Sequence, residues 1–352
     1  MIQFIVKRLA YGVLVVFLVC IIISSVIYLA PVDPARLTFG QRSDTEAVKA
    51  KQKELGLDQA LYVQLAFYLR DISPIALLAD TQENREKYRY FRLVPLGQKA
   101  LVLKAPYLRY SFQTGASVAQ ILGNAIPKTA ILALAAILLA TIVGISLGIL
   151  AALKHNSWFD HSAVIGSVMG FSLPSYVSAM ILALLFGYYW SDFTGLNVRG
   201  SIYDLNDFGD EQFFWKNLIL PALALGIRPI AIITQLTRSA MLDVLEQDYI
   251  RTAKAKGLTY YKVIFKHALR NAMNPVITAI SGWFAALLAG AFFVENVFDF
   301  NGLGQVTVNA LLTYDIPVVL GAVLFTAVLF VGINIVVDVL YAIFDPRVSV
   351  KS

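Results

Sequence analysis

Six long apolar stretches dominate the pattern of hydrophobic and polar positions along the chain. They cover residues 9–30, 129–153, 162–190, 218–237, 272–294 and 316–337. Hydrophobic residues occupy every face of each stretch rather than every second position, so the pattern is not that of a β-barrel. About 20 helical residues cross the hydrocarbon core of a bilayer. We therefore predict an all-α polytopic membrane protein with six transmembrane helices.

Basic residues in the short loops indicate the orientation of these helices. Residues 238–271 contain seven Lys or Arg and three acidic residues, whereas residues 191–217 contain two basic and five acidic ones. Residues 295–315 contain three acidic residues and no basic one. Because cytoplasmic loops carry the excess of Lys and Arg, both termini and the loop 238–271 are expected in the cytoplasm. The first stretch is longer than the about 7–15 apolar residues of a signal peptide, so we expect a retained anchor.

The same pattern divides the chain into parts. We predict an N-terminal tail with the first helix over 1–30, an extracytoplasmic segment over 31–126, a five-helix core over 127–345 and a cytoplasmic tail over 346–352. The core includes the cytoplasmic loop 238–271.

The extracytoplasmic segment has an organisation of its own. Short helices are expected over 46–55 and 60–72, separated by a turn at Gly56-Leu57-Asp58. Residues 74–106 are basic and aromatic and are expected to form a small cap on the membrane face. Such a run can bind single-stranded nucleic acid, but nucleic acid is not an expected partner outside the membrane. Residues 118–126 have apolar spacing suited to a helix in the membrane interface, ending before Pro127.

Composition excludes several kinds of site. Hydrophobic residues make up 58% of the chain and charged residues 15%. A single cysteine, Cys20, excludes a disulfide framework, and three scattered histidines do not have the spacing of a zinc site. The formal charge of +6 does not indicate nucleic acid, because seven of the 29 basic residues lie in one loop between spans. We expect no metal and no cofactor on this chain, and membrane lipid around its basic face.

Residues 144–148 read Gly-Ile-Ser-Leu-Gly and fit the G-x-S-x-G pattern of serine hydrolases. That motif requires a strand–turn–helix elbow, and here it lies inside an uncharged apolar stretch. Gly144 and Gly148 have the spacing of close helix packing, as have Gly166 and Gly170. An intramembrane serine protease would rest on Ser146 alone, so we favour helix packing.

Arg228 is the one charged residue inside the six stretches. A charge at the middle of a transmembrane helix costs about 2.5–3.5 kcal/mol on insertion scales, so it should face protein or a water-filled cavity. Flanking Gly226 and Pro229 can loosen the helix and expose carbonyl groups as partners. Two interpretations stay open: a residue of a translocation cavity, or a structural pair within the helix bundle.

The energy source of any transport must lie outside this chain. The sequence contains no Gly-Lys pair, so it has no P-loop and is not expected to be an enzyme that hydrolyses ATP. An ion-coupled secondary transporter is one alternative, but it would need paired acidic residues within the spans, and the six stretches contain none. A membrane scaffold is another, and Arg228 in mid-span argues against it.

The cytoplasmic loop is the most specific feature, and residues 248–259 read DYIRTAKAKGLT. Strong helix formers continue to Lys256, and Gly257 then ends the helix as C′ glycines do. Thr259 is placed to cap a second helix that continues to Arg270. Two helices joined by a glycine turn predict a rigid lever that transmits force from its tip into two spans. The alternative is an ordinary basic loop anchored by anionic lipid.

This loop resembles the EAA loop of the membrane subunits of ABC importers, and most closely that of B-type permeases of the dipeptide/oligopeptide/nickel family. The match covers residues 248–258 and 267–272. Other matching pieces are Asp33-Pro34-Ala35, Leu55-Gly56-Leu57-Asp58, Trp158-Phe159-Asp160, Leu220-Pro221-Ala222, Gly302-Leu303-Gly304 and Asp345-Pro346-Arg347. The resemblance therefore extends over nearly the whole chain.

The resemblance implies a type I importer fold in the cytoplasmic (inner) membrane of a bacterium. It implies a second permease subunit, of the C-type or a second copy, and an extracytoplasmic substrate-binding protein. Two cytoplasmic ATPase subunits would use ATP and bind the EAA loops. By this resemblance the ATPase-coupling residues are Asp248, Tyr249, Arg251, Ala253, Lys254, Ala255, Lys256 and Gly257. Members of the family carry peptides, nickel or oligosaccharides, and peptides are the expected solute.

Two pieces depart from the family pattern. The family's Pro-Gly-Asp-Pro stands here as Pro31-Val32-Asp33-Pro34, and its Gly-Asp-(Leu)-Gly-x-Ser is replaced by residues 110–115, YSFQTG. Residues 74–110 also form a longer region than usual. Both pieces lie where the binding protein is expected to dock, so they bear on the solute and not on the mechanism.

Overall fold

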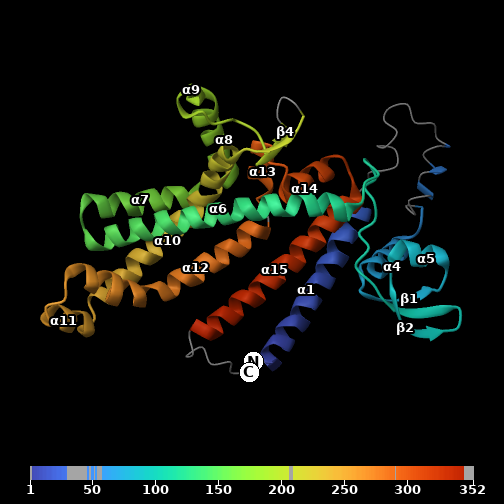
Figure 1. Cartoon of the computed structure of the whole chain (residues 1–352), viewed down its shortest axis with the longest axis horizontal. Helices are drawn as coiled ribbons and strands as arrows, with labels where there is room; N and C mark the ends of the chain where they lie inside the picture. The colour runs from blue at the N-terminus through green and yellow to red at the C-terminus, as the bar shows by residue number, and fades with distance from the viewer. Residues whose placement is uncertain are drawn as a thin grey trace. The chain divides into compact units, whose positions relative to one another are not determined.

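The computed structural model describes residues 2–29, 58–205, 209–289 and 291–344, with positions 46, 49, 50, 52 and 53 (Figure 1). The chain divides into two compact units. One contains Ala125–Gln305 with Met1–Arg8 and Leu329–Ser352, and the other contains Leu9–Asn124 with Val306–Val328. Most of the predicted helix over 46–55, the piece at 31–35 and the tail over 346–352 lie outside the described residues.

Four helices are long and apolar enough to cross a membrane: α1 (Ile2–Leu29), α6 (Val118–Leu153), α10 (Ile219–Leu245) and α15 (Ile316–Phe344). Two bent pairs pass the same test. The first joins α7 (Trp158–Ser172) to α8 (Ser175–Leu182), and the second joins α12 (Leu269–Ala289) to α13 (Phe292–Phe298). If each pair is one span, the described residues contain six, in agreement with the six predicted. The prediction of a polytopic helical membrane protein is confirmed.

The predicted single span over 162–190 is broken in the structure. The axes of α7 and α8 differ by 104°, and a π-helix over Ala183–Tyr189 continues α8. The break lies at Leu173, which has extended backbone with φ −75° and ψ 127°. Pro174 follows, and a proline removes a helical hydrogen bond and disfavours helical dihedrals at the residue before it. Hydropathy alone did not reveal the break, because the residues around it are also apolar.

Pro127 has the opposite outcome. The separate interfacial helix predicted over 118–126 is wrong, because α6 runs without interruption from Val118 to Leu153 and contains Pro127. A proline has no N–H group, so one carbonyl of the preceding turn loses its helical hydrogen bond. This loss does not end a long apolar helix such as α6.

Helix α10 lies at the centre of the larger unit, where it packs against α7, α8 and α12. Its contact with α6 is close: a Cβ atom at Gly144 would lie 2.7 Å from Cγ2 of Ile233, and one at Gly148 would lie 2.5 Å from Cβ of Thr237. The predicted packing role of Gly144 and Gly148 is therefore confirmed. Gly170 contacts Ile227 of α10, but Gly166 faces open space, so the packing prediction is wrong for Gly166.

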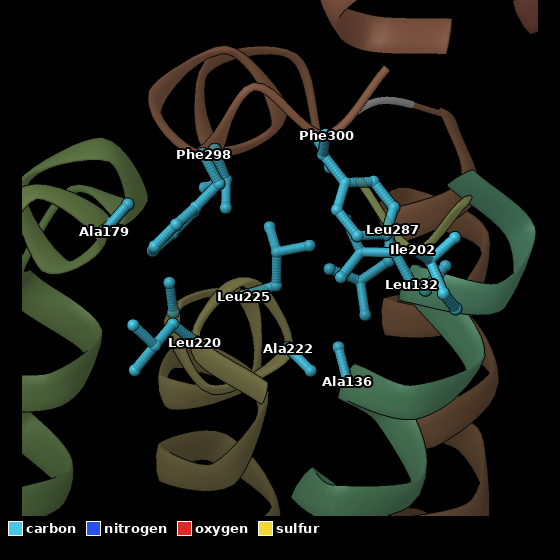
Figure 2. Close-up of a cluster of buried hydrophobic side chains, with 14 of the residues drawn as sticks. Leu132, Ala136, Ala179, Ile202, Leu220, Ala222, Leu225, Leu287, Phe298 and Phe300 are labelled. Carbon is cyan, nitrogen blue, oxygen red and sulfur yellow. The ribbon is translucent and has the colours of Figure 1, made fainter. Parts of the chain in front are cut away.

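A hydrophobic core joins α6, α8, α10, α12 and the end of α13 (Figure 2). Figure 2 shows Leu225 and Phe298 directed into the space between these helices. Ala136 of α6 and Ala179 of α8 contribute small side chains to the same cluster. The remaining elements of this region are α9 (Ser191–Thr194), β4 (Tyr203–Leu205), β5 (Glu211–Phe213) and a 3₁₀ turn (Trp215–Leu218). Helix α14 (Leu303–Leu312) begins in the larger unit, and its residues from Val306 belong to the smaller one. Strands β4 and β5 form an antiparallel pair.

The smaller unit combines membrane helices with a small α/β subdomain. Its cluster of buried residues includes Cys20 of α1, Tyr68 of α4 (Leu61–Ile72) and Leu320 of α15. The hydroxyl of Tyr68 donates a hydrogen bond to the carbonyl of Leu320 at 3.3 Å. The predicted helix over 60–72 is thus present, and Tyr68 attaches it to α15 within this unit.

Residues 74–106, predicted only as a cap, contain a three-stranded antiparallel sheet of order β1-β3-β2. Its elements are β1 (Ile75–Ala79), α5 (Gln82–Tyr88), β2 (Phe91–Leu96) and β3 (Lys99–Leu103). Leu78, Ala100 and Val102 are buried with Tyr88 on one face. The strands are five or six residues long and mainly apolar, and runs of that length do not distinguish a strand from a short helix.

Candidate functional site

The predicted coupling loop folds as a short helix packed on the membrane core. Helix α11 (Asp248–Ala255) follows the end of α10, and a π-helix over Lys262–Ala268 leads into α12. Ile250 and Ala253 of α11 are buried together with Met241 of α10 and Ile149 of α6. One buried cluster therefore joins α11 to α6, α10 and α12.

Gly257 ends α11 in the conformation that the sequence predicts. Its φ is +73°, its N–H donates to the carbonyl of Lys254 at 3.0 Å, and the N–H of Leu258 donates to the carbonyl of Ala253 at 3.4 Å. This pair of bonds is the Schellman arrangement. The second helix begins at Tyr260, directly after Thr259. The turn is therefore a defined structure and not an open loop.

The predicted coupling residues divide between an inner and an outer face. Asp248, Tyr249, Arg251, Lys254, Ala255, Lys256 and Gly257 are exposed, whereas Ala253 is buried. The amide of Asn271 in α12 donates to the hydroxyl of Tyr249 at 2.8 Å. Ala253 and Tyr249 thus hold α11 in place, and the charged residues lie on its exposed side.

Aromatic residues beside the turn extend this outer face, and the sequence analysis did not single them out. Tyr260, Tyr261 and Phe265 are exposed by 59%, 74% and 54%. The rings of Tyr261 and Phe265 are parallel within 8°, with centroids 6.4 Å apart. Tyr261 and Phe265 are four residues apart and so lie on the same face of a helix. This spacing could have indicated the pair from the sequence.

An ion pair joins the start of α7 to α10, at the first residue of the predicted loop 238–271. Both oxygens of the Asp160 carboxylate accept hydrogen bonds from Arg238, from Nε and from Nη2, the latter at 2.8 Å. The N–H of Asn156 also donates to Asp160, at 3.0 Å, and Ser157 caps α7 by accepting from the Asp160 N–H. Asp160 is fully buried, so the pair connects the α6–α7 turn to the base of the loop.

A second buried carboxylate organises the start of α14. Oε1 of Glu295 accepts from the hydroxyl of Thr129 at 2.7 Å, and Oε2 accepts from the N–H groups of Gly304 and Gln305. These amides have no partner within their own helix, and an anion at a helix N-terminus is stabilising. A Cβ atom at Gly304 would lie 2.6 Å from Cα of Phe292. A side chain at position 304 would therefore clash with α13, which accounts for the second glycine of Gly302-Leu303-Gly304.

Arg228 lies between aromatic rings from two other helices. Its guanidinium carbon is 5.2 Å from the ring centre of Phe171 in α7 and 5.9 Å from that of Trp283 in α12. The side chain is half-buried, and its Nε makes no hydrogen bond among the described residues. The structural pair considered from the sequence would require an acidic partner, and no ion pair of Arg228 is present in the described part of the chain.

Comparison with known proteins identifies the family. A family model described as "Binding-protein-dependent transport system inner membrane component" matches residues 144–350, and a model of its N-terminal region matches residues 1–133. The chain belongs to this family. The resemblance to ABC importer permeases is thereby confirmed, and the permease is not itself an enzyme by family.

Relatives of this permease are similar along their whole length. It is 34% identical over 369 residues to the dipeptide transport system permease protein DppB of Escherichia coli (strain K12), covering 100% of both chains. It is 35% identical over 363 residues to the di/tripeptide transport system permease protein DppB of Pseudomonas aeruginosa (strain UCBPP-PA14), covering 99% of both. A solved structure of the MetNI methionine ABC transporter, in inward facing conformations, has a TM-score of 0.51 at 15% identity. It covers 64% of this chain and 97% of that one, and it shows the shared fold.

These findings decide between the alternatives. The family is one of multi-pass membrane components that work with other subunits, so the ion-coupled carrier and the scaffold are not supported. Ser146 lies in the middle of α6 and not on a strand–turn–helix elbow, so the motif at 144–148 is a helix-packing motif.

Proposed function

We propose that this permease forms half of the translocation pathway of an ABC importer for peptides. The names of two full-length relatives, dipeptide and di/tripeptide permeases, support the solute class. The other half of the pathway would come from a second permease, either a C-type partner or a second copy of this chain. Nickel and oligosaccharides are the other solutes that the family resemblance allows.

The observation that carries the mechanism is the coupling helix α11. Its inner face is part of a buried cluster shared with α6, α10 and α12, and its outer face carries exposed charges. Two cytoplasmic ATPase subunits would bind the exposed residues around Lys256 and Gly257 and would use the ATP. This chain would bind no cofactor itself. Closure of the ATPases would push α11, and the shared cluster would carry the movement into the spans.

This mechanism requires both termini and the coupling loop to be cytoplasmic, as the distribution of Lys and Arg supports. The small sheet then lies on the opposite side of the membrane, where a substrate-binding protein delivers the solute. One face of that sheet is apolar and exposed, with Phe91 at 69%. We assign this face to the binding protein, because an exposed apolar patch on a folded domain marks an interaction surface and the family depends on a binding protein.

A pull-down of the tagged chain from its native membrane in gentle detergent, followed by mass spectrometry, tests the assembly. We expect P-loop ATPase subunits and a second six-span permease to co-purify. Gly257→Pro should lose the ATPases and retain the permease, because proline fixes φ near −65° where the turn needs a positive φ. Gly257→Asn is the matched control, since asparagine tolerates that conformation. A wild-type chain that is isolated alone would contradict the proposal.

A further inference from the structure

Arg228 is a cation inside a membrane helix that has no anionic partner in the described structure. It occupies the tenth position of the 27-residue helix α10. Other buried or half-buried arginines of the described residues have acidic partners: Arg238 pairs with Asp160, and Arg109 pairs with Asp71 at 2.9 Å. A charge at this depth is unfavourable by about 2.5–3.5 kcal/mol unless it faces water or an anion. Arg228 is therefore placed to receive an anion from outside the chain.

The two aromatic rings determine how such an anion could approach. Phe171 and Trp283 lie within cation–π distance of the guanidinium carbon. A ring that contacts the face of the guanidinium leaves the N–H groups at its edge free to donate. These edge N–H groups form a planar fork that matches the two oxygens of a carboxylate. The rings thus flank the guanidinium, and its Nε makes no hydrogen bond among the described residues.

The position of Phe171 places this site at the bend of the third span. Phe171 lies two residues before Leu173, where α7 ends and the 104° break begins, and 43% of its surface is exposed. Gly170, the residue before Phe171, lies close to Ile227 of α10, the residue before Arg228. Phe171 is thus partly exposed at the point where the third span bends.

We propose that Arg228 binds the terminal carboxylate of the peptide during its passage. This inference rests on the proposed function as a peptide permease. Peptides of different sequence share only their backbone, their α-ammonium group and their α-carboxylate. A single cation that serves all of them must recognise the carboxylate, and a charge-assisted bidentate contact with Arg is the strongest way to do so.

The test compares the uptake of a dipeptide and of its C-terminal amide by cells that contain the complete importer. The affinity of the binding protein for both compounds is measured separately, and the rates are compared at saturation. We expect Arg228→Gln to lower the maximal rate for the free acid by about tenfold or more, the range of a lost charged hydrogen bond. The rate for the amide should be unchanged, which also reports that the variant folds. Arg228→Lys should keep part of the preference for the acid.

Each other outcome overturns a distinct statement. An equal loss for acid and amide, or no loss, would overturn the assignment of Arg228. If a lipid phosphate is the anion instead, Arg228→Gln will affect both peptides in reconstituted vesicles that contain phosphatidylglycerol and neither in vesicles of phosphatidylcholine alone. A wild-type importer that takes up neither compound would contradict the proposed function itself.

Discussion

At the scale of single residues, glycines set the distance between α6 and α10. At Gly144 and Gly148 the nearest atoms of α10 lie where a side chain would have to be. Gly166 has the same sequence spacing with Gly170 but no neighbour within 4 Å. The spacing of small residues therefore predicted the contacts of Gly144, Gly148 and Gly170 correctly and that of Gly166 wrongly. Spacing alone does not say which face of a helix meets a neighbouring helix.

Gly148→Ala should destabilise the permease. The added Cβ would lie 2.5 Å from Cβ of Thr237 and 2.7 Å from the carbonyl oxygen of Thr234, so the two helices must separate. Overpacking of this kind costs about 1–3 kcal/mol, which thermal unfolding in detergent would detect. Gly166→Ala is the control and should be neutral or stabilising by up to about 1 kcal/mol. Equal unfolding temperatures for the two variants would contradict the packing described here.

Asp80 should make the small sheet sensitive to strong acid. Hydrogen bonds from Arg85 and Tyr90, with the nearby charges of Arg85 and Arg92, lower the pKa of Asp80 from 3.8 to about 2. A carboxyl whose pKa is lowered on folding stabilises the fold above its unfolded pKa, and this stabilisation is lost as the pH falls toward the folded value. We expect it to be complete above about pH 4 and to disappear near pH 2.

Pepsin, which is active in this pH range, can report the effect. Cleavage within residues 75–103 should be faster in Asp80→Asn than in the wild type at pH 4, and the two rates should converge near pH 2. A ratio that stays constant with pH would show that the ion cluster around Asp80 does not stabilise the sheet.

At the scale of elements, the ion pair between Asp160 and Arg238 joins α7 to the end of α10. It lies toward the C-terminal end of the same helix that carries Arg228, before the helix α11. Ser157 caps α7 by accepting a hydrogen bond from the N–H of Asp160, and this bond helps to hold Asp160 in position. The pair therefore links the broken third span to the coupling loop.

Asp160→Asn should destabilise this connection by about 3–5 kcal/mol, because it leaves one partner of a buried pair uncompensated. The double variant Asp160→Asn with Arg238→Gln should regain part of the loss, since no uncompensated charge remains. Thermal unfolding of the three proteins measures both effects, and solute uptake should follow the same order. A double variant that is less stable than either single variant would contradict the account.

At the scale of the whole molecule, the chain combines membrane helices with two exposed surfaces of different chemistry. The proposed coupling helix and the turn after it carry charges and aromatic rings, whereas the exposed sheet face is mainly apolar. The register of β1, β3 and β2 puts one charged residue, Lys99, on that face together with these apolar ones: Ile75, Leu77, Leu101, Leu103, Phe91, Val94 and Leu96. Surfaces of such different chemistry suit different partners.

Leu77→Asp combined with Phe91→Asp should therefore reduce uptake that depends on the binding protein, while the amount of complex in the membrane stays the same. Charges on the apolar face would leave carboxylates desolvated in the docked state. Gln82→Asp, on an exposed position of α5, is the control and should have no effect. Normal uptake by the double variant would contradict the assignment of the sheet face as the docking surface of the binding protein.

Much of the architecture was predictable because it depends on local properties. The length of an apolar run decides whether a helix can cross the membrane, and the positive φ of Gly257 ends α11 with no long-range contact. The break at Leu173-Pro174 was also encoded locally, but apolar residues on both sides concealed it. The sheet was missed because its strands are short and similar in composition to helix segments.

The sequence by itself thus determined the helical membrane class, the number of spans and the helix α11 with its glycine turn. Only the tertiary structure decided which charges meet and which stay without a partner. Asp160 and Arg238 are 78 residues apart, and Thr129 and Glu295 are 166 apart, so no periodicity relates them. The same holds for Arg228: its charge is visible in the sequence, but the rings of Phe171 and Trp283 that orient it come from other helices. Helix packing brings such groups together because it acts on surfaces in space and not on neighbours in the chain.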